Sequence, residues 1–526
     1  MVSTGRMMLD MSNYYWLLPL FFLVILVWKH NRGSLNPNNL PLPPGPRPLP
    51  IIGNILDISK TRPWISYREL STKYGDVLYL RLLGQSVIIL GSPEAAYDLF
   101  ENRSAKYSDR RMSTMASLMG WEWAIPLMPY GQLWRRTRRV LNHYFHHGMI
   151  QNYHASQLRE VHRLLQSLFL SPDQFDRHIR HAFGAVMLSI TYGIEVTGTD
   201  DEYAIIAGKA ADTMEHLISG SHLVDMIPLL RYVPAWFPGA KFQKNIAKWR
   251  KDVVALREVP YATAKAAVEA GSACSSIVSS LLDTLPQQGL VRDDEELAKN
   301  VVGVAYVASV DTSISVTRTF FLAMTLYPEV QKKAQAALDA VLGPHRRPNF
   351  SDRDSLPYIE ALVKECFRWQ LVGPLGFPHS NTMDDEYKGY FIPKGSIIMA
   401  NAWAFSRDPT IYPNPDEFNP ERFLKDGNLD AQVKDPSSFA FGFGRRICPG
   451  RHFADSLFWL TVASVLHVFD IGPPVDATGQ QIPPEAKMTS SILSAPEKFQ
   501  CTIKPRSLSA EALVNSDVAS ATSLVM

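Results

Sequence analysis

The chain has few cysteines and almost no net charge, and each shortage excludes a class of protein. Its four cysteines follow no regular spacing in 526 residues: Cys274, Cys366, Cys448 and Cys501. A chain of this length does not need disulfide staples, so the cysteines are interpreted as reduced thiols facing the cytosol. The formal net charge of +2 gives no argument for nucleic-acid binding. No internal repeat and no second domain boundary is evident.

The chain is rich in apolar residues. It is 46% hydrophobic and 20% charged, which is enough to bury a large core, so one large domain is favoured over several small ones. Val77 to Leu82 and Ser86 to Leu90 are strand-like runs separated by a short turn, and long helical patterns dominate the remainder. The sequence predicts a mainly α fold with a small β portion, formed by a single large domain over residues 55–505.

The N-terminus contains a charge-free, largely apolar run from Tyr14 to Trp28 with aromatic residues at both ends. We expect a transmembrane signal anchor over residues 14–32, after a lumenal segment of residues 1–13. A cleaved signal peptide is the alternative, but no small-x-small site follows the run. Cations from Lys29 to Arg32 place the bulk of the protein in the cytoplasm.

Both flanks of the predicted domain have biased composition. Residues 33–54 are rich in proline, which predicts an extended linker that spaces the domain from the membrane; a ligand for a signalling module is the alternative. Residues 506–526 are rich in Ser, Ala and Val without a clear period, and we expect a disordered tail.

A glycine-rich loop carries one of the cysteines, Cys448. Gly444 and Gly450 allow the backbone to turn sharply and to approach a flat cofactor. Arg445 and Arg446 supply positive charge suited to a cofactor carboxylate and to an acidic partner. A cysteine binds a metal as the thiolate, so nearby cations and backbone dipoles are expected to lower its pKa. A buried free cysteine is the structural alternative.

This loop resembles the heme-binding signature of the cytochrome P450 family, with Phe441, Gly444, Arg446, Cys448 and Gly450 at its fixed positions. The resemblance implies a P450-like fold and a heme b cofactor (iron protoporphyrin IX). It makes Cys448 the axial ligand of the heme iron, and it makes Phe441, Arg446 and Gly450 heme-binding residues.

Two further segments match the same family in order. Glu365 and Arg368 resemble its Glu-x-x-Arg helix, which Pro357 is expected to open, and Arg422 resembles the arginine that joins that pair. The resemblance implies a structural network of Glu365, Arg368 and Arg422, which would be costly to break if it is buried.

The longest helix is expected over residues 293–327, buried on nearly all sides. A buried Asp311 followed by Thr312 in its middle resembles the family's oxygen-activation segment, which makes both residues catalytic carriers of protons. A polar stripe satisfied by neighbours is the alternative. The family usually has Gly where this chain has Ser309, whose hydroxyl we expect to bond back to the Ala305 carbonyl.

Other matches concern the heme carboxylates and the protein surface. Trp134 and Arg138 lie at i, i+4 and resemble a pair that holds a heme propionate, and His379 resembles a cationic propionate contact. Outward-facing cations are expected to form a basic surface for an acidic flavoprotein reductase: Arg135, Arg136, Arg139, Arg445 and Arg451. A solvated helix face is the alternative for these cations.

The resemblance extends to fungal microsomal members of the family. It implies a heme-thiolate monooxygenase anchored in the endoplasmic reticulum membrane, with membrane lipid, NADPH-cytochrome P450 reductase and a hydrophobic small molecule as partners. The substrate would be a terpenoid, a sterol-like or a polycyclic aromatic compound, in secondary metabolism or xenobiotic oxidation. The candidate pocket residues are apolar: Trp121, Trp123, Tyr306, Ala308, Leu371, Val372, Leu375, Phe377 and Ile492.

Two other functions stay open. One is a reductase-independent heme-thiolate isomerase, dehydratase or peroxygenase, and the other is a non-catalytic heme-binding protein. The presence of Asp311 and Thr312 argues against both, because neither needs a proton relay.

Overall fold

The computed structural model describes residues 36, 38–196, 201–219, 223–226, 228–236, 242–284, 291–476 and 478–523. The predicted membrane anchor lies outside these residues. Within them, no helix has the length and apolar character needed to cross a membrane.

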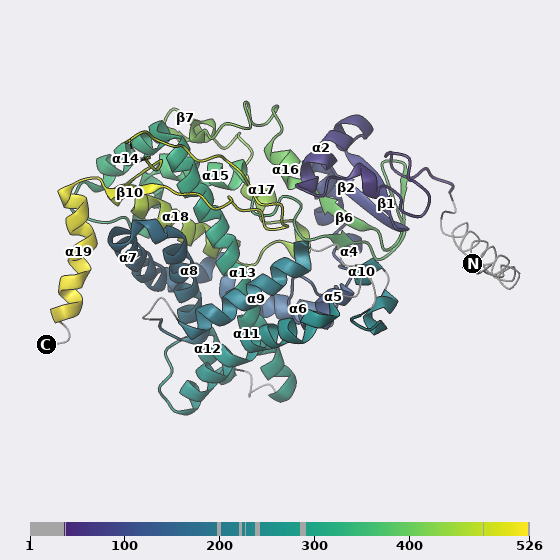
Figure 1. Cartoon of the computed structure of the whole chain (residues 1–526), viewed down its shortest axis with the longest axis horizontal. Helices are drawn as coiled ribbons and strands as arrows, with labels where there is room; N and C mark the ends of the chain where they lie inside the picture. Colours follow the sequence, from purple (N-terminus) through teal and green to yellow (C-terminus); the bar gives the residue numbers. More distant parts are fainter. Residues whose placement is uncertain are drawn as a thin grey trace, which may run out of the picture.

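The described chain is mainly helical, as predicted (Figure 1). The helices are α2 (Pro63–Tyr74), α3 (Pro93–Tyr97), α4 (Ser104–Tyr107), α5 (Thr114–Met119), α6 (Gln132–Phe145), α7 (His154–Leu170), α8 (Phe175–Tyr192), α9 (Glu202–Ser219), α10 (Leu223–Met226), α11 (Gln243–Glu269), α12 (Ile277–Thr284), α13 (Val291–Leu326), α14 (Pro328–Leu342), α15 (Pro357–Trp369), α16 (Ala402–Ser406), α17 (Ser437–Ala440), α18 (Arg451–Val468) and α19 (Leu508–Ser523). Short turns of other helix types include η3 (Asp98–Asn102), η6 (Pro228–Tyr232), η9 (Pro420–Phe423) and η10 (Gly444–Arg446).

Among the described residues the β portion is small and consists of four sheets. The largest has the strand order β1-β2-β6-β3, in which only the β2 and β6 pair is parallel. The other three are antiparallel pairs, β9 with β10, β4 with β5, and β7 with β8. The strands are β1 (Val77–Leu82), β2 (Gln85–Leu90), β3 (His379–Ser380), β4 (Asp385–Tyr387), β5 (Tyr390–Ile392), β6 (Ile397–Ala400), β7 (Leu424–Lys425), β8 (Asn428–Leu429), β9 (Phe469–Gly472) and β10 (Thr502–Pro505).

Helix α13 forms the centre of the helical part. It packs against α8, α11, α18, α6 and α15, while the β1-β2-β6 sheet and α2 lie at one end of the molecule (Figure 1). The predicted long helix is confirmed, and its bounds differ from the expected ones by one or two residues at each end. Valines at 301, 302 and 304 are buried, as the all-round apolar pattern predicts.

The proline-rich segment does not stand away from the domain after Pro41. The N–H of Phe391 donates to the Pro41 carbonyl over 2.8 Å, and the N–H of Tyr79 donates to the Pro44 carbonyl over 2.9 Å. A Cβ added at Gly45 would lie 2.0 Å from the carbonyl oxygen of Tyr79. Proline carbonyls still accept hydrogen bonds, so this segment is bound to β5 and to the edge strand β1 and is no free spacer.

The expected disordered tail is wrong for Leu508–Ser523, which forms α19. The Ser507 hydroxyl accepts a hydrogen bond from the N–H of Ala510 at the start of this helix. Ala510 and Val514 are one turn apart and are only 5% and 1% exposed. Two buried residues on one face suffice to hold the helix against α7 and α18, a tertiary contact that composition alone does not reveal.

Candidate active site

The cysteine loop is closed by a hydrogen bond between its two ends. Cys448 donates its backbone N–H to the carbonyl of Phe441 over 2.8 Å, and Ile447 donates to Gly444 over 3.1 Å. Gly444 has a φ of +56°, a left-handed conformation that favours glycine. A Cβ added there would lie 1.9 Å from the carbonyl oxygen of Phe100. Glycine is therefore required at this position for two independent reasons.

Burial has the largest effect on the pKa of the Cys448 thiol. It raises the pKa of the thiol, while the backbone N–H of Gly450 and the charges of Arg138 and Arg451 act in the opposite direction. The expected net lowering of this pKa is wrong for the chain alone, because the desolvation of a thiolate outweighs the three favourable contributions. A coordinated metal ion has a larger effect and deprotonates a thiol outright.

Arg446 fastens the loop to the preceding part of the domain. Its side chain is buried and donates to three backbone carbonyls, those of Ser108 at 2.8 Å, Ile125 at 3.3 Å and Met128 at 2.9 Å. The guanidinium lies 4.5 Å from the ring centroid of Trp134, which α6 places in the core. Burial lowers the pKa of Arg446 to about 10, so it stays charged at neutral pH.

Two further arginines lie beside this loop without a carboxylate partner among the described residues. Burial and the nearby charges of Arg446 and Arg138 lower the pKa of Arg110, and its Nε is buried without a hydrogen-bond partner. Burial also lowers the pKa of Arg138, which the Cys448 thiol partly offsets. Cations that are largely removed from water without a counter-charge are costly, and both side chains are partly buried. The pair therefore fits a ligand with two carboxylates, as heme b has.

Arg110 was not expected from the sequence. It stands next to Arg111, whose exposed guanidinium donates to Gln85 over 2.6 Å, and no local pattern separates the two arginines. Only the packing distinguishes them, since the Arg110 guanidinium lies 5.4 Å from the ring centroid of Phe377.

His379 on β3 is buried and neutral. Its Nδ1 lies 2.9 Å from the carbonyl oxygen of Tyr107, which fixes the neutral tautomer with a proton on Nδ1. The ring stacks on Phe100 with centroids 4.0 Å apart. Burial and the charge of Arg110 lower the pKa of His379 to about 3. The expected cationic imidazole is therefore wrong for the chain alone; a carboxylate at Nε2 would favour protonation.

The structure brings Glu365, Arg368 and Arg422 together in one buried network. Arg368 donates Nε and Nη2 to the Glu365 carboxylate at 2.7 and 2.8 Å, and Arg422 donates Nε over 3.2 Å. The N–H of Asn419 adds a bond of 2.7 Å to the same carboxylate. The other donors of Arg368 reach the carbonyls of Ser406, Pro415 and Glu417. The bracing role of this network stays a prediction.

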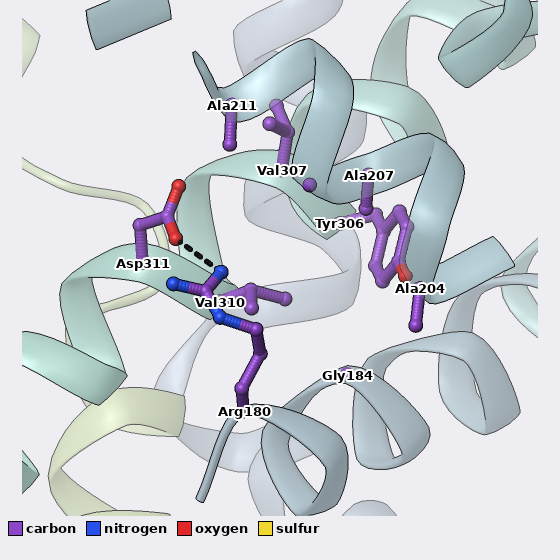
Figure 2. Close-up of a pocket in the computed structure, with 10 residues that line it drawn as sticks. Arg180, Gly184, Ala204, Ala207, Ala211, Tyr306, Val307, Val310 and Asp311 are labelled. Carbon is purple, nitrogen blue, oxygen red and sulfur yellow. Dashed lines mark hydrogen bonds and ion pairs between the residues drawn. The ribbon is translucent and has the colours of Figure 1, made fainter. Parts of the chain in front are cut away.

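The acid on α13 is not buried as expected. The Asp311 side chain is 30% exposed and accepts a hydrogen bond of 2.9 Å from Nη1 of Arg180 on α8. Figure 2 shows this ion pair at the edge of a small pocket between α8, α9 and α13. Its other lining residues are mostly small: Gly184, Ala204, Ala207, Gly208, Ala211, Tyr306, Val307 and Val310. The pocket leaves the carboxylate accessible, and Arg180 supplies its counter-charge.

The hydroxyl groups near Asp311 bond within the helix. Thr312 donates Oγ1 to the Ala308 carbonyl over 2.8 Å. Ser309 donates Oγ to the Tyr306 carbonyl over 2.9 Å, not to Ala305 as expected. The carbonyls three and four residues back are both within reach of a helical hydroxyl, so the spacing alone does not select between them.

The predicted pocket residues separate into an accessible and a buried group. Ala308 is exposed although Val307 and Val310 beside it are buried, so it marks an accessible face of α13. Four other predicted residues are partly exposed: Val372, Leu375, Phe377 and Ile492. Hydrogen bonds tie their segments together, because Ser494 donates its N–H to Val372 and accepts from Ser315 of α13.

The buried group packs in the core. Trp121 is fully buried and donates Nε1 to Thr213 of α9 over 3.0 Å. Tyr306 points towards α9 in Figure 2, and its hydroxyl donates to the Tyr203 carbonyl over 3.3 Å. Leu371 is also buried, and the ring of Trp123 packs over Gly303 of α13.

The expected basic surface is smaller than predicted. Arg135, Arg139 and Arg445 are exposed, and Arg445 donates to the Tyr130 hydroxyl over 2.7 Å. Arg136 instead forms an ion pair with the buried Asp294 at the start of α13. The helical spacing of α6 places Arg136 towards α13, a neighbour that the local charge pattern does not reveal.

Comparisons with known proteins agree with this site. The cytochrome P450 family model matches residues 43–503. The chain is 41% identical to the cytochrome P450 monooxygenase COX2 of Coprinopsis cinerea, over 95% of this chain and 94% of that protein. It is 42% identical to a cytochrome P450 monooxygenase of Armillaria gallica over 94% and 97% of the two chains. It is also 40% identical to the tryptamine 4-monooxygenase of Psilocybe cyanescens, over 88% and 93%. The chain belongs to the cytochrome P450 family and is a cytochrome P450 monooxygenase.

Proposed function

We propose that Cys448 is the axial thiolate ligand of heme b and that electrons come from NADPH through a separate NADPH-cytochrome P450 reductase. One oxygen atom of O2 is inserted into a hydrophobic small molecule. The observation that carries this proposal is the presence of two partly buried arginines, Arg110 and Arg138, beside a partly buried thiol and without carboxylate partners among the described residues. When bound, a thiolate-ligated heme supplies the activation of dioxygen.

The chain's own residues hold the cofactor and its ligand. Arg110 and Arg138 would each neutralise a propionate, with Trp134 and His379 beside them as the resemblance implies. The backbone N–H of Gly450 faces the sulfur of Cys448 and stabilises its negative charge. Phe441 and Arg446 hold the two sides of the loop, through the bond to Cys448 and through the backbone carbonyls described above.

Proton supply is the proposed task of Asp311 and Thr312. Both members of the pair of Asp311 with Arg180 are partly exposed, so its opening costs only about 0–1 kcal/mol. An opened Asp311 can then take up a proton from solvent through the pocket in Figure 2. Thr312 follows in the chain, and its Oγ1 can pass a proton on once it leaves the Ala308 carbonyl.

The substrate is proposed to be an apolar terpenoid, sterol-like or polycyclic aromatic compound. Accessible apolar side chains from three segments support this choice, namely Ala308, Val372 and Ile492. Apolar walls with few polar groups favour ligands of this kind. Incubation with reductase, NADPH and one panel of each class, followed by mass spectrometry for products 16 mass units heavier, tests it. A product only from a charged or strongly polar panel would contradict the proposal.

The reductase is proposed to dock on the exposed cations of α6 and the cysteine loop. Arg135, Arg139 and Arg445 support an acidic partner. Charge reversal at Arg139 is expected to slow electron transfer mainly at low salt, because screening removes long-range attraction. A matched reversal at Lys73, on α2, serves as the control. Equal effects of the two reversals would contradict the docking face.

We also propose an endoplasmic reticulum location, with the run from Tyr14 to Trp28 as the anchor and the catalytic domain in the cytoplasm. Exposed apolar side chains on the described domain support contact with lipid: Ile51 at 86%, Leu56 at 75%, Leu229 at 73% and Trp236 at 79%. A chain that lacks residues 1–32 is expected to bind vesicles weakly, and Trp236→Ser is expected to weaken it further. Release of the full chain by high salt alone would contradict the anchor.

The central experiment is the absorbance spectrum of the reduced, carbon-monoxide-bound protein. We expect the red-shifted Soret band of thiolate-ligated iron, which Cys448→Ala abolishes. Cys274→Ala is the matched control, because this cysteine is exposed. A histidine-type spectrum of the wild-type protein would refute the assignment. Product formation without NADPH consumption would favour the reductase-independent function, and heme binding without any turnover would favour a carrier.

A further inference from the structure

The segment from Asp98 to Asn102 is a π-helical turn, η3. The N–H of Arg103 donates to the Asp98 carbonyl over 2.9 Å, five residues back in the chain. Single π turns are rare and occur frequently at functional sites. This one packs against η10, the turn that precedes Cys448 in the cysteine loop.

Two consecutive residues of η3 hold the same glycine of that loop. The carbonyl oxygen of Phe100 lies so close to Gly444 that no side chain fits between them. The carboxylate of Glu101 accepts the N–H of Gly444 over 2.5 Å. The Phe100 ring also stacks on His379 and lies 5.9 Å from the ring of Phe443. The π turn therefore contacts the loop through backbone, charge and aromatic packing at once.

We propose that Glu101 is a positioning residue for the thiolate ligand, an inference that rests on the proposed heme-thiolate function. Gly444 lies midway in the loop that the bond from Cys448 to Phe441 closes. Gly444 has a left-handed conformation, and glycine has the most conformational freedom of all residues. Contacts from outside the loop are therefore needed to hold its backbone in this conformation. A bond from an N–H to a carboxylate is roughly twice as strong as a neutral one.

The other hydrogen bonds that hold the loop do not replace the one between Glu101 and Gly444. Arg446 holds the C-terminal side through backbone carbonyls, and Arg445 bonds to Tyr130. Gly444 is the first residue of η10, and its N–H points out of the loop towards Glu101. Without the carboxylate, the start of the turn is free to shift, and the shift passes to Cys448 through the bond from Ile447 to Gly444.

The test compares Glu101→Ala, Glu101→Asp and Glu101→Gln with the wild-type chain. Ala removes the acceptor, Asp keeps the charge but shortens the reach by one methylene, and Gln keeps an oxygen at the same distance. Glu94→Ala is the matched control, because Glu94 is exposed on the preceding helix α3. The carbon-monoxide spectrum is followed with time, and deuterium exchange is measured on the peptide that covers the cysteine loop.

We expect Glu101→Ala to lose the thiolate-type Soret band about tenfold faster than wild type, the factor expected for one charge-assisted hydrogen bond. Loop exchange rises in parallel. Gln keeps an acceptor in place but loses the charge, so it is expected midway between wild type and Ala, and Asp, whose carboxylate no longer reaches the N–H of Gly444, is expected close to Ala. If Glu101→Ala does not fold, the order of Gln and Asp still tests the inference. A spectrum as stable as that of Glu94→Ala, or a lowered melting temperature with an unchanged band, would overturn it. A wild-type protein without the thiolate band would instead overturn the proposed ligation.

Discussion

Removal of the Glu365 carboxylate is expected to destabilise the domain strongly. Glu365 and Arg368 are both 0% exposed, and the Arg422 side chain is 6% exposed. In Glu365→Ala the two guanidinium groups lose their counter-charge, and the N–H of Asn419 loses its acceptor. Breaking a buried ion pair from one side costs about 3–5 kcal/mol. The ratio of folded to unfolded protein falls by roughly a hundredfold to several thousandfold, since about 1.4 kcal/mol corresponds to a factor of ten.

A nearby exposed ion pair provides the control. Glu421 pairs with Lys333, and the two side chains are 51% and 54% exposed, so Glu421→Ala is expected to cost less than about 1 kcal/mol. Urea unfolding of purified protein, followed by far-ultraviolet circular dichroism and by heme absorbance, measures both variants. If Glu365→Ala lies within about 1 kcal/mol of the control, the buried charge network does not brace the fold.

Three more predictions concern charges near the site. Arg110→Leu is expected to release heme at least about tenfold faster than Arg111→Leu in a transfer assay to apomyoglobin, and equal rates would exclude Arg110 as a propionate partner. Asp311→Asn is expected to lower product per NADPH at least about tenfold while Arg180→Met retains it, because only the first removes the proton carrier; equal losses would contradict this. In the heme-free chain, the pKa of His379 is about 3, against 6.5 without burial. Between these two values the unfolded chain binds up to one more proton than the folded chain. The free energy of unfolding therefore decreases by up to about 1.4 kcal/mol for each pH unit as the pH falls below about 6.5. A plot of urea midpoint against pH should be flatter for His379→Phe than for the wild-type chain.

Much of the fold follows from local patterns. The apolar period of α13 and the proline that opens α15 predict helices close to the observed ones. The alternation in β1 and β2 predicts the hairpin. The tail was predicted wrongly because its helix α19 depends on two buried contacts with α7 and α18, and such contacts leave little trace in composition.

The site is only partly readable from the sequence. Cys448 and the pair of Glu365 and Arg368 stand in short motifs that resemble family signatures, so they could be predicted from the local sequence; their roles stay predictions. The bond between Arg180 and Asp311 joins residues 131 positions apart, and no local pattern predicts it. Protonation is equally non-local, because the raised pKa of the Cys448 thiol depends on its burial among distant elements.

Three neighbouring groups have protonation states or charges in the chain alone that a bound cofactor would change. Burial disfavours the Cys448 thiolate and keeps His379 neutral. Arg110 has no carboxylate partner among the described residues. At neutral pH only the charged Arg110 costs stability, because the thiol and the imidazole are largely neutral there in both the folded and the unfolded chain. A metal cation at the sulfur would favour the thiolate, and a carboxylate near the arginine would supply its counter-charge; heme b carries both groups. The same binding energy then stabilises the folded state, since a ligand that binds only the folded chain raises its stability by mass action. The counter-charge that Arg110 lacks in the chain alone is thus one expected source of the free energy of heme binding.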